Sequence, residues 1–587
     1  MRAIVSSLRR NAFIRLRAPR LPAFSLIRTT SPQCGPRHHV QRILNAHTER
    51  AYHTSHEEPT IYALSTANGR AAIAVIRVSG PACRQIYQGL CPSTALPKPR
   101  YATLRKLYVP GVPPSLETIL DSGALVLYFP APNTVTGEDV LELHVHGGPA
   151  IVRAVLAAIP ECAKTLEDSE SMRKQIRYAE PGEFTRRAFA NNRMDLPQIE
   201  SLGETLSAST EQQRSISVRG TTSSLAVRYE NWRMLLLQAR GELEALIDFS
   251  EDQHFDESPA VLCANVADQV RALQMQMEVH IANAFRGELL RNGISVALLG
   301  APNAGKSSLL NRIVGRDAAI VSQEAGTTRD IVEIGLDLGG WLVKIGDMAG
   351  LRRAGIAGAD IVGAVEQEGI RRAKQRALES DVLIVVQDAT TEMDPEVMET
   401  AKQCVDMGVE VIVALNKCDQ LQTFELSRTA WEEKTYSALR LPKDRLCFIS
   451  CTSPVAPSYT WKSDNIPAFL TTLQDTFRSM TAALVPESDP DPSIWQESLG
   501  ATERQRLLLS ECLSHLSTFL TAVADPSADP TRSGEENLDE ADEVDIVVAA
   551  ECLRSAADAL ARITGRGDGG DVEEILGVVF EKFCVGK

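Results

Sequence analysis

The 587-residue sequence predicts a multidomain α/β fold, in which an N-terminal α+β domain precedes a helical domain that an inserted α/β domain divides into two segments. Three observations predict this fold class. The apolar, partly β-branched run Ile294–Leu299 is typical of a buried strand, and a glycine-rich loop and a helix-like pattern follow it. Apolar residues recur at three- to four-residue spacing on both sides of that segment. Short strand-like runs separated by turn signals occupy residues 60–159.

The composition is that of a globular chain large enough for several domains. It is 44% hydrophobic and 23% charged, and no apolar run reaches the length of a transmembrane helix. The formal net charge of −15 excludes a protein that coats RNA with its whole surface. The twelve cysteines form no C-x-x-C pair, so we expect reduced thiols and no zinc site.

The first 48 residues differ from the rest, because they contain nine arginines and no acidic residue. This composition predicts a mitochondrial transit peptide over residues 1–56, and therefore a protein of the mitochondrial matrix. A basic arm that binds nucleic acid is the alternative. Removing the nine arginines takes the formal charge from −15 to −24, so any RNA contact by the remaining chain must be a local basic patch.

Residues 57–180 predict a small α+β domain. Two strand-like runs, 61–67 and 71–80, flank an Asn68-Gly69 turn signal, and a third run at 122–132 precedes a strand that leads into a helix. His144 and His146 alternate on that strand and so share a face, which leaves a metal site and a structural role open. The structural role is favoured because no third ligand is evident.

Residues 181–290 and 483–587 show helical periodicity, which predicts one helical domain assembled on both sides of an insert at 291–482. An acidic interruption at 246–257 predicts a loop between helices. The segment 525–543, rich in Asp, Glu, Pro and Ser, predicts a flexible acidic loop.

The insert begins with a phosphate-binding motif. Gly300-Ala-Pro-Asn-Ala-Gly305-Lys306-Ser307 fits G-x-x-x-x-G-K-[ST] between the predicted strand and helix. Glycines let the backbone N–H groups of such a loop point at phosphate oxygens, where the positive end of the helix dipole also acts. Lys306 is placed to reach the β- and γ-phosphates, and the Ser307 hydroxyl to ligate Mg²⁺.

Further motifs follow in the order found in small GTPases. Thr328, in a polar switch-like segment at 318–330, offers a hydroxyl to Mg²⁺, and Asp347-x-x-Gly350 suits the metal's water shell and the γ-phosphate. Asn416-Lys417-Cys418-Asp419 offers a carboxylate to guanine N1–H and N2–H₂, donors that adenine lacks. Ser450-Cys451-Thr452 suits guanine O6. Together they predict an inserted Ras-like P-loop G domain that binds GTP.

Longer motifs resemble those of the MnmE-type (TrmE/MnmE) tRNA-modification GTPases. They are IYALSTANGRAAIAVIRVSGP, TGEDVLELHVHGG, PGEFTRRAFANNRMDLPQIESLGETLSAST and the terminal FCVGK, and the resemblance covers the chain from about residue 59. It implies that the N-terminal domain dimerises and binds a tetrahydrofolate one-carbon donor, 5,10-methylenetetrahydrofolate, at a site that also takes the 5-formyl analogue. The positions that match the folate-binding residues are Arg77, Glu142, Arg193 and Lys587. The family usually has Lys where Arg193 stands. For Cys584, beside that pocket in the family, a reactive thiol and an inert one both remain open.

The resemblance also implies hydrolysis assisted by K⁺ in place of an arginine finger, and no Gln follows Gly350 in the Ras manner. The matching K⁺ positions are Asn303, Ser322, Glu324 and Thr327. Glu366 matches a glutamate of the family that positions the attacking water. The catalytic candidates are Glu366, Lys306 and Thr328. Two departures are Met348, where the family usually has Thr, and extra residues between 352 and 366. The positions expected at the GTP site are Asn303, Ala304, Gly305, Lys306, Ser307, Ser308, Ser322, Gln323, Glu324, Ala325, Gly326, Thr327, Thr328, Asp347, Met348, Ala349, Gly350, Asn416, Lys417, Asp419, Ser450, Cys451 and Thr452.

The implied function is that of a mitochondrial GTPase that forms a homodimer and works with a flavin-containing (FAD) MnmG-type partner on mitochondrial tRNA. Together they install a carboxymethylaminomethyl-type group, or a taurine-derived one, at C5 of the wobble uridine U34. GTP hydrolysis drives G-domain dimerisation and a conformational change. One alternative is a ribosome-assembly GTPase of Era or EngA type, which needs a KH-like RNA module that the sequence lacks. Another is a non-catalytic structural GTPase, against which the folate-like motifs and FCVGK count.

Overall fold

The structure, a computed structural model, describes residues 58–165, 176–221, 224–249, 259–316, 318–324, 333–346, 371, 374–421, 424–452, 465–486, 492–524 and 546–565. The predicted transit peptide, the predicted acidic loop 525–543 and the terminal FCVGK lie outside these residues. The same holds for part of the predicted site, namely Ala325, Gly326, Thr327, Thr328, Asp347, Met348, Ala349, Gly350, Glu366, Cys584 and Lys587.

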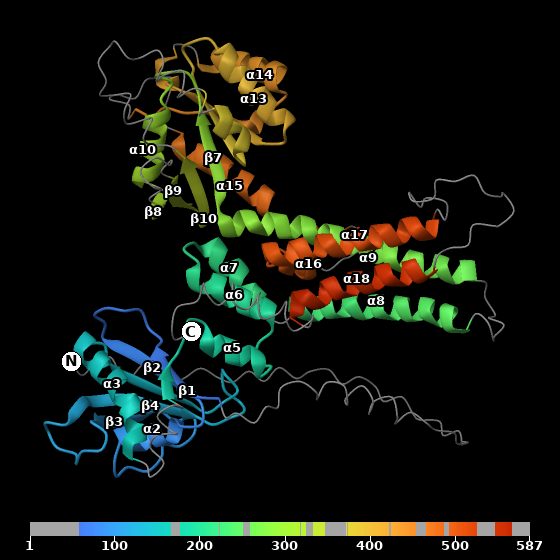
Figure 1. Cartoon of the computed structure of the whole chain (residues 1–587). Coiled ribbons are helices and arrows are strands. Elements are labelled where there is room, and N and C mark those ends of the chain that lie inside the picture. Colours follow the sequence, from blue (N-terminus) through green and yellow to red (C-terminus); the bar gives the residue numbers. More distant parts are fainter. Residues whose placement is uncertain are drawn as a thin grey trace, which may run out of the picture. The chain divides into compact units, whose positions relative to one another are not determined.

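A six-stranded sheet with the order β3-β4-β5-β2-β1-β6 forms the N-terminal part of the described chain (Figure 1). Its strands are β1 Thr60–Leu64, β2 Ile73–Ser79, β3 Thr103–Tyr108, β4 Ile119–Phe129, β5 Val140–His146 and β6 Ile176–Tyr178. All neighbours are antiparallel except β1 and β6, which are parallel. Along β4, Val126 is buried whereas Leu125 is exposed. This alternation is typical of an antiparallel sheet with one packed face.

Two helices, α2 (Cys83–Leu90) and α3 (Pro149–Glu161), cover the packed face. Their apolar residues form one core with the inward side chains of β2, β4 and β5. On the other face, Phe184 of α5 (Glu183–Ala190) packs against Ile61 and Ala63 of β1. This second face is therefore only partly covered, and the polar residues of β2 and β5 lie on it.

Four long helices from distant parts of the sequence pack side by side (Figure 1). They are α8 Ser224–Phe249, α9 Pro259–Asn292, α17 Glu503–Ala524 and α18 Ile546–Thr564. Since α8 contacts α18 and α9 contacts α17, the two helical segments of the sequence share one core. Shorter helices accompany them, namely α6 Leu196–Ser207, α7 Glu211–Gly220 and α16 Pro492–Ser498. Capping boxes start α6 and α7, with Asp195 and Thr210 as the N-cap residues.

The helical core contains one buried polar chain. His280 of α9 is fully buried, and its Nε2 lies 2.9 Å from the hydroxyl of Tyr229, which donates to Gln505 Oε1 at 3.2 Å. Burial lowers the pKa of His280 to about 3, so the imidazole is neutral at pH 7.

A seven-stranded sheet with the order β13-β12-β11-β7-β10-β9-β8 forms the inserted domain. Its strands are β7 Ile294–Leu299, β8 Ala318–Glu324, β9 Glu333–Leu338, β10 Trp341–Gly346, β11 Val382–Asp388, β12 Glu410–Asn416 and β13 Leu446–Phe448. The five from β13 to β10 are parallel, and β9 and β8 continue the sheet antiparallel. The main helices are α10 Lys306–Arg316, α13 Pro395–Asp406, α14 Phe424–Leu439 and α15 Ile466–Thr481.

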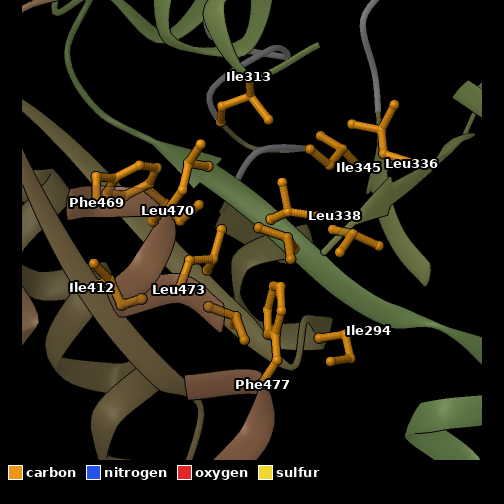
Figure 2. Close-up of a cluster of buried hydrophobic side chains, with 14 of the residues drawn as sticks. Ile294, Ile313, Leu336, Leu338, Ile345, Ile412, Phe469, Leu470, Leu473 and Phe477 are labelled. Carbon is orange, nitrogen blue, oxygen red and sulfur yellow. The ribbon is translucent and has the colours of Figure 1, made fainter. Parts of the chain in front are cut away.

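Helices cover both faces of this sheet. On one face, Phe469 and Phe477 of α15 and Ile313 of α10 join the core with Ile294 and Ile412 (Figure 2). On the other face, α13 and α14 pack against the alternate residues of β11 and β12. The strands in between read as continuous apolar runs because they are buried from both sides.

The predicted fold class is confirmed: an α+β part, helices from two sequence segments and an inserted Ras-like α/β part are all present. The strand predicted at Ile294–Leu299 has these bounds in the structure. Sequence reasoning did not find α2, β3 or β6, and it described 318–330 as a switch-like segment although its first half is the edge strand β8. Within the described ranges, every helix is too short or too polar to cross a lipid bilayer.

Candidate functional site

The glycine-rich loop connects β7 to α10 at the carboxyl end of the parallel strands, where α/β sheets bind ligands. Gly305 has φ +103°, and a Cβ there would lie 2.0 Å from Asn416 Nδ2. A Cβ on Gly300 would lie 2.1 Å from the carbonyl oxygen of Val386. Asn303 has φ 61°, a left-handed conformation that Asn tolerates better than most residues. The loop is therefore closely packed against β11 and β12.

Lys306 begins α10, and its ammonium is held inside this loop. Nζ donates to the carbonyl oxygens of Gly300 at 2.6 Å and Ala301 at 2.9 Å. Burial lowers the pKa of Lys306 from its usual value. Ser307 and Ser308 follow on the first helical turn and are exposed, whereas Ala304 is buried. The lysine thus contacts two neutral acceptors, which an anion can replace.

A second group of predicted residues lies beside this loop, in what we name the NKCD corner: residues 416–419 and 450–452. Asn416, at the end of β12, donates through Nδ2 to the Ala304 carbonyl at 2.9 Å, and its Oδ1 accepts from the Cys451 N–H at 3.1 Å. One buried side chain therefore joins the glycine-rich loop to the 450–452 loop.

Asp419 lies in the same corner. Its carboxylate accepts from the Ser450 hydroxyl at 2.7 Å and from the Thr452 hydroxyl at 3.5 Å. The NKCD corner therefore brings together the carboxylate and the loop that the sequence assigns to guanine.

Lys417 has φ 64°, which is strained for a residue with a side chain. Its Nζ lies 2.5 Å from Asp388 Oδ2, at the end of β11. Burial alone would raise the pKa of Asp388. Hydrogen bonds from Lys417 and Thr390 have the opposite and larger effect, so the pKa lies below its usual value. Sequence reasoning missed Asp388, although its place at the end of a buried strand beside β12 was a usable signal.

The structure describes only part of the switch-like segment. Ser322, Gln323 and Glu324 lie on β8, opposite Gly335, Ile334 and Glu333 of β9 in the strand register. The remaining predicted switch residues lie outside the described chain. Of the described K⁺ and Mg²⁺ candidates, Asn303 lies in the glycine-rich loop, Ser307 in the first turn of α10, and Ser322 and Glu324 on β8.

The predicted folate residues lie on the partly covered face of the six-stranded sheet. Arg77 of β2 and Glu142 of β5 are cross-strand partners, and Arg77 Nη2 lies 3.0 Å from Glu142 Oε1. His144 Nε2 lies 3.3 Å from the other oxygen of this carboxylate. Glu142 and Arg193 both line one cavity of about 360 Å³, which we name the N-terminal pocket. Its lining residues are Arg100, Phe129, Asn133, Thr134, Val135, Val140, Glu142, Arg193 and Met194.

Sequence reasoning missed much of this lining. Arg100 comes from the segment before β3, and its guanidinium carbon lies 5.8 Å from the centre of the Phe129 ring. Phe129 ends β4, opposite Val140 of β5. The pocket thus combines an apolar wall with a carboxylate and two guanidinium groups, a lining suited to a flat heterocycle that carries an anionic tail.

The two histidines that suggested a metal each contact a carboxylate instead. His144 pairs with Glu142, and His146 Nδ1 lies 2.8 Å from Asp121 Oδ1. Asp121 is buried, and hydrogen bonds from the N–H groups of Gly123 and His146 outweigh burial and lower its pKa. Among the described residues, no group of three or more His, Cys, Asp or Glu side chains could hold a metal ion.

Two family descriptions match the chain: GTP-binding protein TrmE N-terminus over residues 60–193, and MnmE helical domain over residues 196–584. The tRNA modification GTPase MnmE of Paramagnetospirillum magneticum is 38% identical, over 90% of this chain and 99% of its own. The mitochondrial tRNA modification GTPase mss1 of Schizosaccharomyces pombe is 35% identical, over 91% and 96%. The mitochondrial 5-taurinomethyluridine-[tRNA] synthase subunit GTPB3 of Homo sapiens is 35% identical, over 90% and 93%. The chain therefore belongs to the MnmE (TrmE) family of tRNA modification GTPases.

Proposed function

We propose that this chain is a mitochondrial GTPase that takes part in modifying C5 of the wobble uridine of mitochondrial tRNAs. One observation carries the proposal: this chain has both a phosphate loop joined to the NKCD corner and a pocket lined by Glu142 and Arg193. The mitochondrial site of action rests on the names of the eukaryotic relatives, which are mitochondrial proteins, and on the arginine-rich first 48 residues. We place the protein in the matrix.

In this proposal GTP binds along the edge formed by the glycine-rich loop and the NKCD corner. Lys306 exchanges two carbonyl oxygens for the β- and γ-phosphates, which costs little reorganisation because its ammonium already lies in the loop. Asp419 exchanges two hydroxyl donors for guanine N1–H and N2–H₂. Ser307, exposed on the first turn of α10, ligates Mg²⁺ together with Thr328, and Asp347 holds its water shell.

The remaining GTPase residues keep the roles that their motifs imply. Asn303, with Ser322, Glu324 and Thr327, holds K⁺, which supplies positive charge to the phosphates during hydrolysis. Glu366 positions the attacking water. GTP hydrolysis brings the G domains of a homodimer together and apart, and so controls the modification reaction.

The N-terminal pocket holds the tetrahydrofolate one-carbon donor in this proposal. The Glu142 carboxylate accepts hydrogen bonds from the pteridine edge, and Arg77 holds it in place. Phe129 and Val140 give the flat ring an apolar wall. Lys587 completes the site from the C-terminal tail. A bound folate supplies a one-carbon unit, and the residues named here bind and orient it.

The partner proposed is a flavin-containing protein of MnmG type, and the product is a carboxymethylaminomethyl-type or taurine-derived uridine. The human relative is named as a synthase subunit, which supports an assembly of more than one protein. The ribosome-assembly alternative loses its support, because the family matches cover residues 60–193 and 196–584.

The test is mass spectrometry of the wobble nucleoside of mitochondrial tRNA from cells that produce either the native chain or the Lys306→Ala variant in place of the endogenous protein. The proposal predicts the modified uridine with the native chain and unmodified uridine with the variant. Fully modified uridine with the variant would show that the modification does not need GTP binding or hydrolysis by this chain. Unmodified uridine with both, at normal protein levels in mitochondria, would contradict the proposed function.

A further inference from the structure

Two guanidinium groups at the N-terminal pocket are attached to neighbouring carbonyls of one loop. Arg100 Nη2 donates to the carbonyl oxygen of Asn133, and Arg193 Nε donates to that of Thr134 at 3.0 Å. The two arginines are far apart in the sequence, and both are exposed residues that line the pocket. We name them the rim arginines. The two cations are therefore attached to the same short stretch of backbone at the pocket.

The loop that holds them is itself firmly attached. The Thr134 hydroxyl donates to the Glu138 carbonyl at 2.6 Å, and the Ala131 N–H donates to Asp139 Oδ1 at 2.9 Å. The Arg100 backbone is fixed as well, since its N–H donates to the Tyr128 carbonyl at 2.8 Å. Both guanidinium groups are therefore positioned before any ligand arrives, which lowers the entropy cost of binding one.

Their charge is not neutralised by the described chain. No carboxylate of the described residues lies within ion-pair distance of Arg100 or Arg193, whereas the Arg77 guanidinium is paired with Glu142. The sequence around Arg100 adds to this positive charge, because no Asp or Glu occurs between Pro59 and Leu116, and Lys98 is exposed two residues away. Two guanidinium groups at one pocket, with no carboxylate partner among the described residues, favour an anionic ligand there.

The rim arginines are separate from the part of the pocket where Glu142 lies. Arg100 sits over Phe129, the last residue of β4, whose cross-strand partner is Val140. Glu142 lies two residues further along β5, about 7 Å away by strand geometry. A ligand whose heterocycle contacts Glu142 would therefore extend its other end past Phe129 toward the rim.

We infer that the rim arginines bind the glutamate tail of the folate and favour donors that carry several γ-linked glutamates over the monoglutamate. Each added glutamate brings another carboxylate, and carboxylates accept hydrogen bonds from guanidinium groups with strong geometric preference. Lys98, exposed two residues before Arg100 in the sequence, adds a further positive charge for the additional carboxylates. This inference rests on the proposed folate site.

The experiment measures equilibrium binding of 5-formyltetrahydrofolate to the full chain, once as the monoglutamate and once as the pentaglutamate. For the native chain we expect the pentaglutamate to bind about tenfold more tightly. In the Arg100→Gln variant this ratio should fall to about two, mainly through weaker binding of the pentaglutamate. Raising the salt concentration should reduce the native ratio and leave the variant's ratio almost unchanged.

Arg153→Gln is the matched control. Arg153 of α3 is also an exposed arginine that donates to a main-chain carbonyl, that of Pro149 at 3.2 Å, but it does not line the pocket. The Arg153→Gln variant should keep the native ratio of pentaglutamate to monoglutamate affinity, although it loses the same positive charge as Arg100→Gln. Circular dichroism checks that each variant is folded. A second variant, Arg193→Gln, tests the other cation independently.

The outcomes separate this inference from the function on which it rests. Equal affinity of the native chain for the two folates would overturn the inference while leaving the folate site intact. An equal loss for both folates in Arg100→Gln would also overturn it, since Arg100 would then only shape the pocket. No binding of either folate to the native chain would contradict the proposed folate site itself.

Discussion

In the NKCD corner, the carboxylate of Asp419 and the ammonium of Lys417 both have charged or hydroxyl partners within the protein. The rim arginines of the N-terminal pocket find only carbonyl acceptors among the described residues. A site whose polar groups already have partners gains from a ligand only where the ligand's hydrogen bonds are better than those it replaces. Such a site discriminates between ligands by their pattern of hydrogen-bond donors and acceptors. A site with cations that lack a carboxylate partner binds any suitable anion and discriminates by the number of negative charges on the ligand. We therefore expect base specificity in the first and tail-length preference in the second.

The largest expected effect is in the NKCD corner. Asp419→Asn replaces an acceptor of two guanine donors by a group that offers an N–H, so we expect GTP affinity to fall about 100-fold. Affinity for xanthosine triphosphate, whose base presents an acceptor in place of the amino group, should rise. Competition binding with a fluorescent nucleotide measures both. A variant that lost both nucleotides equally would show a folding defect, and one that kept GTP would remove Asp419 from the site.

The corresponding change in the N-terminal pocket is Glu142→Gln. It keeps the shape but removes the charge that accepts from the pteridine and pairs with Arg77, so folate affinity should fall about 10- to 30-fold. GTP affinity should not change. His144→Asn is the control, because it removes a neighbour of Glu142 and leaves the carboxylate in place. Unchanged folate binding in Glu142→Gln would take this carboxylate out of the binding site.

A smaller effect is expected from Asp388, which acts through Lys417. Asp388→Asn weakens the contact to Nζ and lets the lysine side chain move, so GTP affinity should fall about fivefold with base selectivity unchanged. Asp388→Glu should recover part of the loss. Asp394→Asn, which changes the N-cap of α13 by the same charge, is the matched control and should bind GTP normally. Equal losses in both would point to a general charge effect.

A last effect, on stability and not on binding, concerns pH and lies in neither site. Burial holds the pKa of His280 at about 3, below its usual 6.5, so the unfolded chain binds a proton before the folded chain as the pH falls. The stability that the neutral imidazole contributes is complete above about pH 6.5 and is lost progressively toward pH 3. Between pH 7 and pH 5 this is roughly 2 kcal/mol.

Urea unfolding followed by helical circular dichroism measures this effect. The native chain should lose more stability between pH 7 and pH 5 than His280→Gln, whose side-chain amide can still donate to the Tyr229 hydroxyl. Identical pH dependence in the two proteins would show that His280 becomes protonated in the folded state.

The two sites also differ in how far the sequence predicts them. The GTP site follows from local motifs, because the strand before Gly300, the glycine loop and the turn after β12 each have a short-range signature. The N-terminal pocket does not. Arg100, Phe129 and Arg193 meet because β4 pairs with β5 and because α5, which precedes Arg193, packs through Phe184 against β1 of the same sheet. Periodicity cannot show contacts between segments so far apart, and the resemblance supplied Arg77, Glu142, Arg193 and Lys587 but not Arg100 or Phe129.

The same reasoning explains the elements that were missed. The strand β3 contains Arg105 and Lys106 and stands at the sheet edge, so it lacks the apolar alternation of a half-buried strand. The helix α2 has only eight residues, too few for a clear helical period. Asp388 was not found because its function depends on Lys417, which reaches it from the neighbouring strand's loop.

The most direct test of the account is GTP turnover by the full chain in KCl and in NaCl at equal ionic strength, for the native protein and for Asn303→Gly. Glycine suits the left-handed backbone at this position and removes only the carboxamide proposed to hold K⁺. The account predicts turnover at least fivefold faster in KCl for the native chain and no salt preference for the variant. Equal native turnover in the two salts would contradict potassium-assisted hydrolysis at this site.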